Sequence, residues 1–137
     1  MTSPPSDRVL RGAAVVAVLF GLLTIASGGR ALFGGAEARA AAGAYVPFVL
    51  WFNFLAGFAY LAAGAGLWLG RRWAAPLALA IGVATLLVFA AFGVHVWRGG
   101  AYQARTVGAM TLRTLVWLAI AFLAVRRLPP APRVTAR

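Results

Sequence analysis

The sequence contains no cysteine and no lysine, only two acidic residues and a single histidine. Without cysteine, the chain by itself cannot form a disulfide, ligate a metal through thiolates or hold an iron–sulfur cluster. The acidic residues, Asp7 and Glu37, both lie outside the long apolar segments. The chain therefore lacks the carboxylate within the membrane that proton-coupled cation exporters use.

What remains is a strongly apolar and basic chain. Of the 137 residues, 63% are hydrophobic, the mean hydropathy is +0.88 and the formal net charge is +11. This apolar content is too high and too continuous for a soluble domain of the same length. All 13 basic residues are arginines, and they stand singly or in pairs between apolar segments. That distribution is typical of membrane proteins and argues against nucleic-acid binding.

Four apolar segments are long enough to cross a bilayer, which takes about 20 residues each. The sequence predicts transmembrane helices at about residues 9–29, 46–69, 73–97 and 106–126. Tryptophans bracket the third segment at Trp73 and Trp97, as expected at the two membrane–water interfaces. The connector 70–75 is so short that the second and third helices must be antiparallel neighbours.

The segments outside these helices are short. An alanine run within the connector 30–45 predicts a small interfacial helix, and three prolines in residues 128–137 predict a disordered tail. The first apolar segment has small residues at 26–28, so cleavage as a signal peptide is an alternative. A retained helix is preferred because the later segments already require membrane insertion.

Arginine placement predicts the orientation. Eight arginines fall on the side that holds both chain ends, four fall on the other side, and Arg113 lies within a segment. The positive-inside rule then places both termini in the cytoplasm and the loop 98–105 outside. The predicted fold is an all-α integral membrane protein, an antiparallel bundle of four transmembrane helices in a single membrane domain.

Few polar side chains lie within the predicted helices, and several share a helical face. Met110 and Arg113 follow Thr106 at intervals of four and three residues, and Asn53 lies at a similar depth in the second helix. We therefore expect one outward-facing pocket that favours an anionic or carbonyl-bearing ligand. The candidate ligand-binding residues are Asn53, His95, Arg98, Tyr102, Met110 and Arg113.

Arg113 has two interpretations. An arginine at the centre of a transmembrane helix costs about 2.5 kcal/mol or more on insertion scales. Arg113 lies eight residues beyond Arg105, about 12 Å along a helix, so its side chain can reach back toward the outer water and the lipid head groups. Alternatively, it is buried in the bundle and faces Asn53, His95 or a ligand.

His95 and Met110 raise the question of a metal. A lone histidine near a helix end is more often an interfacial hydrogen-bonding residue than a ligand. One histidine cannot supply two axial haem ligands within one chain, so haem would have to be shared across a dimer. One histidine and one methionine make a weak metal signal. The sequence therefore predicts no metal site, and Asn53 also has a simple structural role as a helix–helix hydrogen bond.

The order of the later segments resembles a known family. The second apolar segment ends in LAAGAGLWLG, and the basic corner RRWA, an alanine-rich third segment, an outer loop and a fourth segment follow. This layout, over about residues 46–125, is similar to the DoxX-like superfamily of small four-helix bacterial membrane proteins. The resemblance implies a place in the bacterial inner membrane and a link to thiosulfate:quinone oxidoreductases. Family members often carry a glutamate in the second helix, where this chain has Asn53.

Three functions follow as hypotheses. The first is a non-catalytic membrane accessory protein or subunit of a quinone-linked redox complex, with quinone as the candidate cofactor. The alternative is a dimeric transporter or channel for a small anion or neutral solute. An independent enzyme is the least favoured, because the chain shows no convincing set of acid, base and nucleophile. The expected partners are membrane lipid and either further copies of the chain or a larger membrane complex.

Overall fold

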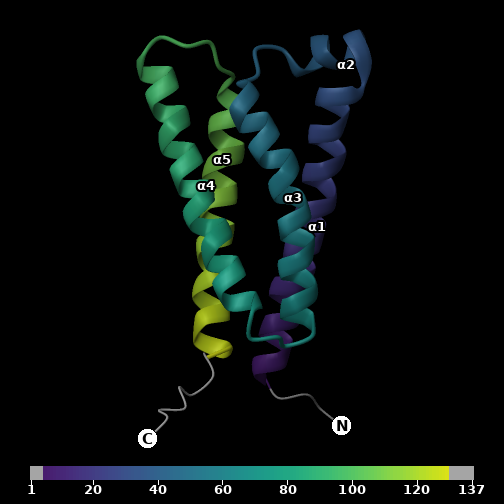
Figure 1. Cartoon of the computed structure of the whole chain (residues 1–137), viewed down its shortest axis with the longest axis vertical. Helices are drawn as coiled ribbons and strands as arrows, with labels where there is room; N and C mark the ends of the chain where they lie inside the picture. Colours follow the sequence, from purple (N-terminus) through teal and green to yellow (C-terminus); the bar gives the residue numbers. More distant parts are fainter. Residues whose placement is uncertain (1–4, 130–137) are drawn as a thin grey trace, which may run out of the picture.

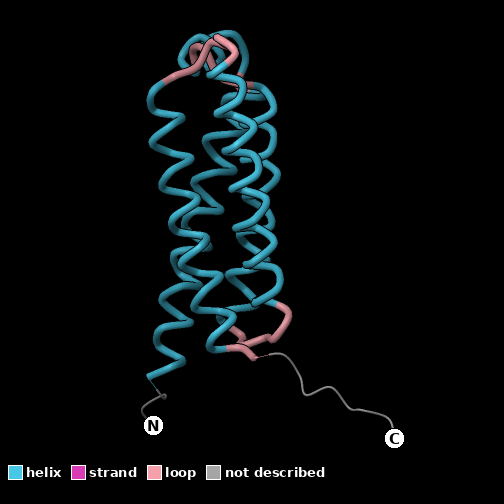
Figure 2. Tube along the Cα trace, turned by 90° about the vertical axis from the view of Figure 1, so that its left-hand side faces the viewer, coloured by secondary structure: helices cyan, strands magenta, loops and turns pink. Residues whose placement is uncertain are grey.

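The computed structural model describes residues 5–129, and these residues form helices and connecting loops without any strand (Figure 2). Four helices are long and one is short. The elements are α1 (Pro5–Phe33), α2 (Gly35–Ala42), α3 (Pro47–Trp68), α4 (Ala74–Trp97) and α5 (Ala104–Arg127).

The four long helices are apolar enough and long enough to cross a membrane. The shortest, α3, has 22 residues, which at 1.5 Å per residue is about 33 Å and matches a hydrocarbon core of about 30 Å. Large apolar side chains such as Leu23, Leu87 and Leu115 are exposed on the outside of the bundle. The prediction of four long apolar helices is confirmed.

The helix bounds differ from the predicted ones mainly at α1. This helix begins at Pro5 and ends at Phe33, beyond the predicted 9–29, because no proline or positive-φ glycine interrupts it before Gly35. Proline is well tolerated in the first turn of a helix, where its missing N–H costs nothing. The alanine run forms α2, as expected. Gly35 begins this helix and Gly43 follows its last residue, and both have a positive φ (+86° and +65°).

The start of the predicted tail belongs to the folded part. Leu128 packs in the main core, and its N–H donates to the carbonyl oxygen of Ala124 at 2.8 Å. Residues 130–137 of the predicted tail lie outside the described residues.

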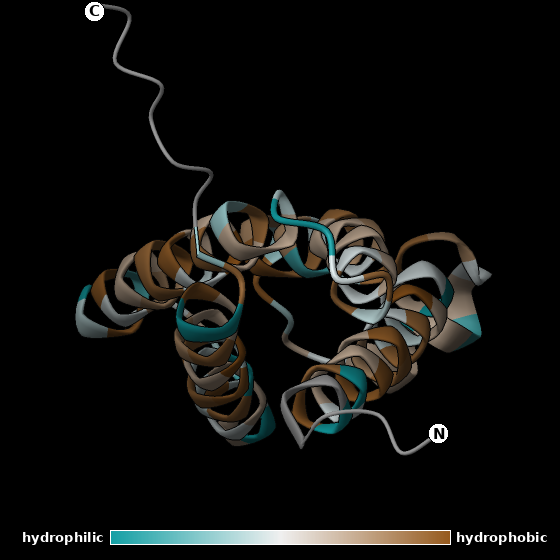
Figure 3. Ribbon diagram, turned by 90° about the horizontal axis from the view of Figure 1, so that it is seen from below, coloured by the Kyte–Doolittle hydropathy of each residue, from teal (hydrophilic) through white to brown (hydrophobic). Residues whose placement is uncertain are grey.

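The long helices form two closely packed pairs, α1 with α3 and α4 with α5. Glycine lets α1 and α3 touch. A Cβ atom added at Gly57 would lie 2.7 Å from Cγ1 of Ile25, and one at Gly64 would lie 2.6 Å from Cγ2 of Val18. In Figure 1, α1 begins and α5 ends at the lower end of the molecule, while α2 lies at the upper end. Seen from below in Figure 3, the helices follow an arc, and hydrophilic residues gather at the helix ends.

The core has two parts. The larger cluster fills the lower part of the bundle around Tyr60 and Trp117. The smaller cluster lies toward the α2 end, where Val46, just before α3, and Val49, in its first turn, meet Phe92 of α4 and Met110 of α5. Between the two pairs of helices, beside this smaller cluster, the bundle leaves room for a cavity.

Candidate functional site

A cavity of about 640 Å³ lies among α1, α2, α3 and α5 in the upper half of the bundle. It passes from exposed side chains at the α2 end to half-buried and buried ones deeper in the bundle. The lining residues are Thr24, Ser27, Gly28, Arg30, Ala31, Ala38, Ala41, Ala42, Tyr45, Leu50, Asn53, Gln103, Arg105, Thr106, Ala109, Met110 and Arg113.

Arg113 provides the deepest charge in the cavity. It is half-buried on α5, and its Nη2 donates a hydrogen bond to the hydroxyl oxygen of Thr24 on α1 at 3.1 Å. Thr24 is only 2% exposed, so the guanidinium reaches inward to the neighbouring helix. The Nε of Arg113 is buried and has no partner among the described residues. The structure therefore favours the buried interpretation of Arg113 over extension to lipid head groups.

Asn53 faces the same space from α3. Its Nδ2 donates to the sulfur of Met110 at 3.7 Å, and thioether sulfur is a weak acceptor. Its Oδ1 is buried and has no partner among the described residues. A buried polar group left without a hydrogen bond costs about 1–3 kcal/mol. A cavity with this much room lets water or a ligand make those bonds.

The charge of the lining has one sign. Three arginines, Arg30, Arg105 and Arg113, contribute to it, and no carboxylate does among the described residues. Arg30 and Arg105 are exposed near the mouth, whereas Arg113 lies further in. Several positive charges close together attract anions and raise the local anion concentration. The cavity is therefore electrostatically suited to an anion or to a strong hydrogen-bond acceptor.

Arg105 also holds α2 at the mouth of the cavity. Its Nη2 donates to the carbonyl oxygens of Ala41 at 3.1 Å and Ala42 at 2.8 Å, and its Nε donates to Oε1 of Gln103. The last carbonyls of a helix lack intrahelical partners and carry partial negative charge. An arginine at this position therefore satisfies the C-terminal end of α2 and connects it to the start of α5.

Two aromatic rings pack together in the core below the cavity. The rings of Tyr60 and Trp117 are tilted by 33° to each other with centroids 4.6 Å apart, and both side chains are completely buried. Trp117 follows Arg113 by about one helical turn on α5. Neither Tyr60 nor Trp117 lines the cavity, which therefore does not reach this part of the core.

The structure brings together three of the six predicted site residues. Asn53, Met110 and Arg113 line the cavity, and Thr106, which shares their predicted face on α5, lies there as well.

His95, Arg98 and Tyr102 are not among the lining residues. α4 packs mainly on α5 and α3, and the α4–α5 connection reaches the cavity only at Gln103, next to the start of α5. The Nε2 of His95 donates a hydrogen bond to the carbonyl oxygen of Ala101 at 3.0 Å. This bond ties the end of α4 to the loop that follows it. The structure therefore does not place His95 beside Asn53 in the lining of this cavity.

Arg98 and Tyr102 also lie outside the lining of the cavity. Arg98 is exposed, directly after the last residue of α4. The ring of Tyr102 meets that of Phe92 edge to face, with centroids 6.1 Å apart.

Sequence reasoning missed the contribution of α1. Thr24 and Ser27 are hydroxyl residues three positions apart in an otherwise apolar segment, which is a signal for one polar helical face. The signal is weak because a serine or threonine hydroxyl can also bond to its own helix, as that of Ser27 does to the carbonyl oxygen of Thr24 at 3.4 Å.

Comparison of the chain with models of protein families, with curated proteins and with solved structures gives no match. The geometry and charge of the cavity are therefore the basis for its function.

Proposed function

We propose that this chain is a small multi-pass membrane protein that binds an oxyanion or a carbonyl-bearing ligand in the cavity of Arg113, as a non-catalytic subunit or accessory protein. The observation that carries the proposal is the guanidinium of Arg113. It lies inside an apolar bundle, is bonded to a neutral hydroxyl, has a buried Nε without a described partner and faces no carboxylate in the lining.

A ligand oxygen would supply what Arg113 lacks. The guanidinium presents its N–H donors in a planar fork that suits carboxylates, phosphates and sulfur oxyanions, and a quinone carbonyl is a weaker acceptor of the same kind. Asn53 would add a donor or acceptor from the opposite wall. Binding is favoured over catalysis because the described lining contains no carboxylate, histidine or thiol to serve as acid, base or nucleophile.

A subunit role is favoured over transport by the packed core below the cavity. Passage of an anion through the bundle would have to displace the packed rings of Tyr60 and Trp117. The resemblance to DoxX-like proteins implies a quinone-linked partner in the bacterial inner membrane, and we adopt that as the setting. In this proposal the bundle is antiparallel, both termini are cytoplasmic and the cavity opens on the outer side.

The test measures ligand binding to the purified chain in mild detergent. Sodium sulfate serves as the oxyanion probe, a short-chain benzoquinone as the carbonyl probe, and sodium chloride at equal ionic strength as the blank. Thermal unfolding is followed by light scattering, and affinity is measured by calorimetry. A probe at 100 times its Kd stabilises the folded state by about 2.7 kcal/mol, which gives a clear shift of the unfolding temperature.

Variants of two arginines assign the binding to the cavity. Arg113→Leu should abolish the shift, and Arg113→Lys should restore only part of it because lysine lacks the planar fork. Arg98→Gln is the control, since Arg98 is an exposed arginine at the same end that does not line the cavity. An unchanged shift in Arg113→Leu would refute the proposal. A wild-type response in Arg113→Lys would show that a point charge suffices, as expected for an arginine that serves only lipid head groups.

A further inference from the structure

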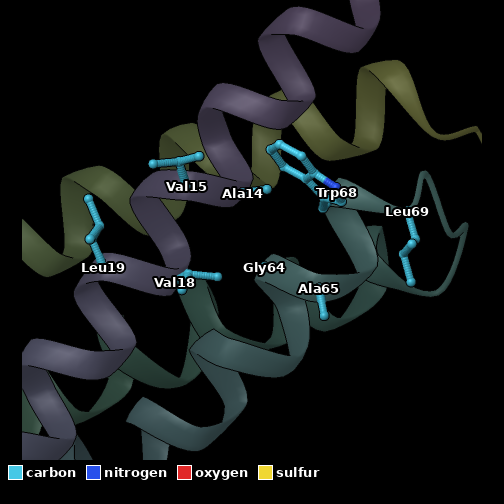
Figure 4. A pocket seen from close by; sticks show the side chains of 8 residues that line it. All are labelled: Ala14, Val15, Val18, Leu19, Gly64, Ala65, Trp68 and Leu69. Atoms are coloured by element: carbon cyan, nitrogen blue, oxygen red, sulfur yellow. The ribbon is translucent and has the colours of Figure 1, made fainter.

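A second hollow lies at the opposite end of the molecule from the cavity. It is a groove of about 440 Å³ on the outside of the bundle, between α1 and α3 (Figure 4). All of its lining residues are apolar, and small side chains form its bed, with Ala14 on α1 and Gly64 and Ala65 on α3. Val15 and Leu19 are exposed at its rim.

The groove follows from the way α1 and α3 touch. At Gly64 the helices are in contact, because an added Cβ would lie 2.6 Å from Cγ2 of Val18 and 3.2 Å from the carbonyl oxygen of Ala14. One residue further on, Ala65 is exposed and too small to fill the space beside that contact. From Ala14 to Leu19 the groove runs about 8 Å along α1, well within one leaflet of a bilayer whose hydrocarbon core is about 30 Å thick.

The end of the groove nearest the N-terminal end of α1 is charged. A smaller hollow of about 190 Å³ shares Trp68 and Leu69 with the groove and adds Arg11 to the lining. The guanidinium carbon of Arg11 lies 5.1 Å from the centroid of the Trp68 ring, a cation–π contact. A guanidinium stacked in this way keeps its N–H donors in its own plane, where they can bind a phosphate.

The surroundings of Arg11 are basic. Arg8, Arg71 and Arg72 are exposed at this end of the molecule. Of the two acidic residues in the sequence, Asp7 belongs to the start of α1 at this same end, where the arginines outnumber it, and Glu37 lies on α2 at the opposite end. An anionic group is therefore the complement of this end, and a second copy inserted in the same direction would bring its own arginines toward Arg11 instead.

We propose that the groove and the Arg11–Trp68 pair bind one anionic phospholipid, with an acyl chain in the groove and the phosphate at Arg11. An apolar groove that leads directly to a stacked arginine matches the two parts of such a lipid. Trp68 lines both hollows and suits the boundary between them, because a tryptophan ring packs on an apolar chain while its N–H can bond to polar groups. The site is separate from the cavity of Arg113, so either proposal can fail without the other.

The experiment uses the purified, delipidated chain and native mass spectrometry. The probes are dioleoyl phosphatidylglycerol and dioleoyl phosphatidylcholine, offered together at equal concentration in mild detergent, and sodium phosphate offered alone. We expect one phosphatidylglycerol to be retained in about fivefold preference, the effect of one arginine near an anionic head group. Phosphate alone should not be retained, because it lacks the chain that fills the groove.

Paired variants separate the two parts of the site. Arg11→Gln should remove the preference, while Ala65→Phe should reduce the binding of both lipids by filling the groove. The controls are Arg126→Gln and Ala62→Phe. Arg126 also stacks on an aromatic ring, that of Phe122 at 5.4 Å, but lies on α5, and Ala62 is exposed on α3 without lining the groove.

Three outcomes would overturn the proposal. The first is equal retention of the two lipids by the wild-type chain, and the second is an equal loss of preference in Arg126→Gln and Arg11→Gln. The third is a dimer of the wild-type chain that Ala65→Phe dissociates, which would assign the groove to a second copy. Arg11→Lys keeps the positive charge at position 11. The proposal is supported if Arg11→Lys retains the preference for phosphatidylglycerol and Arg11→Gln loses it.

Discussion

At the scale of single residues, the central feature is an arginine whose partner is a hydroxyl. Thr24 and Arg113 are 89 positions apart in the sequence, yet their side chains form the hydrogen bond that directs the guanidinium into the bundle. A hydrogen bond to a charged group contributes about 1.5–3 kcal/mol, more than one between neutral groups. The position of Arg113 in the cavity therefore depends on a residue of α1.

The first prediction concerns this bond. Thr24→Val keeps the shape of the side chain and removes the acceptor, so it should lower the free energy of unfolding by about 1–2 kcal/mol. In an Arg113→Leu background the same change should cost little, because the bond is already absent. The measurement is a double-mutant cycle of reversible unfolding in a denaturing detergent.

Thr111→Val is the matched control for Thr24→Val. The hydroxyl of Thr111 donates to the carbonyl oxygen of Val107 on its own helix at 2.8 Å, and the side chain is exposed. A loss at Thr24 that is equally large with and without Arg113 would show that the two side chains do not interact.

At the scale of elements, α2 stands out among the described helices because it buries none of its residues. It has eight residues, begins at one glycine with positive φ and ends before another. An isolated helix of this length is not stable in water. Its position over the mouth of the cavity therefore relies on contacts at its ends, and Arg105 provides such a contact at the C-terminal end.

The second prediction is that Arg105→Gln loosens α2. Losing the charge-assisted bonds to Ala41 and Ala42 should speed amide hydrogen exchange in residues 35–43 by about tenfold, equivalent to about 1.4 kcal/mol. Exchange in α3 and α4 should stay unchanged. Arg39→Gln is the control, because Arg39 is exposed on α2 itself. Unchanged exchange in α2 of the Arg105 variant would show that other contacts hold the helix.

At the scale of the whole molecule, charge and hydropathy are distributed along one axis. The start of α1, the α3–α4 corner and the end of α5 lie at the lower end of Figure 1, and the cavity lies in the upper half. Arg8, Arg71 and Arg126 belong to the lower end, so from the positive-inside rule we expect this end to face the cytoplasm. We expect the mouth of the cavity to open on the outer side for the same reason.

The third prediction tests this orientation. The chain has no cysteine, so Ala101→Cys and Ala131→Cys each create a single thiol. On intact cells an impermeant thiol reagent should label the cysteine at position 101, in the loop between α4 and α5, and not the cysteine at position 131, which follows Arg126 and Arg127 in the sequence. Labelling after cell lysis shows that both thiols react. The opposite pattern on intact cells would reverse the orientation and place the cavity on the cytoplasmic side.

The sequence by itself determined the four long apolar helices and the short helix between the first two. It did so because hydropathy and helix-breaking glycines act locally, along the chain. It also indicated that Met110 and Arg113 share a face, since helical periodicity fixes that for residues of one helix. The presence of Asn53 at the same depth followed from counting residues along α3.

Only the tertiary structure decided which helices enclose the cavity. Helix pairing depends on close contacts such as Gly21 with Gly57, and no pattern within one helix encodes its partner. Because α1 also contacts α5, Thr24 meets Arg113. His95, at the end of α4, is hydrogen-bonded to Ala101 in its own loop and does not line the cavity. The sequence thus determined the helices and their polar faces, whereas the packing of one helix on another determined which residues line the cavity.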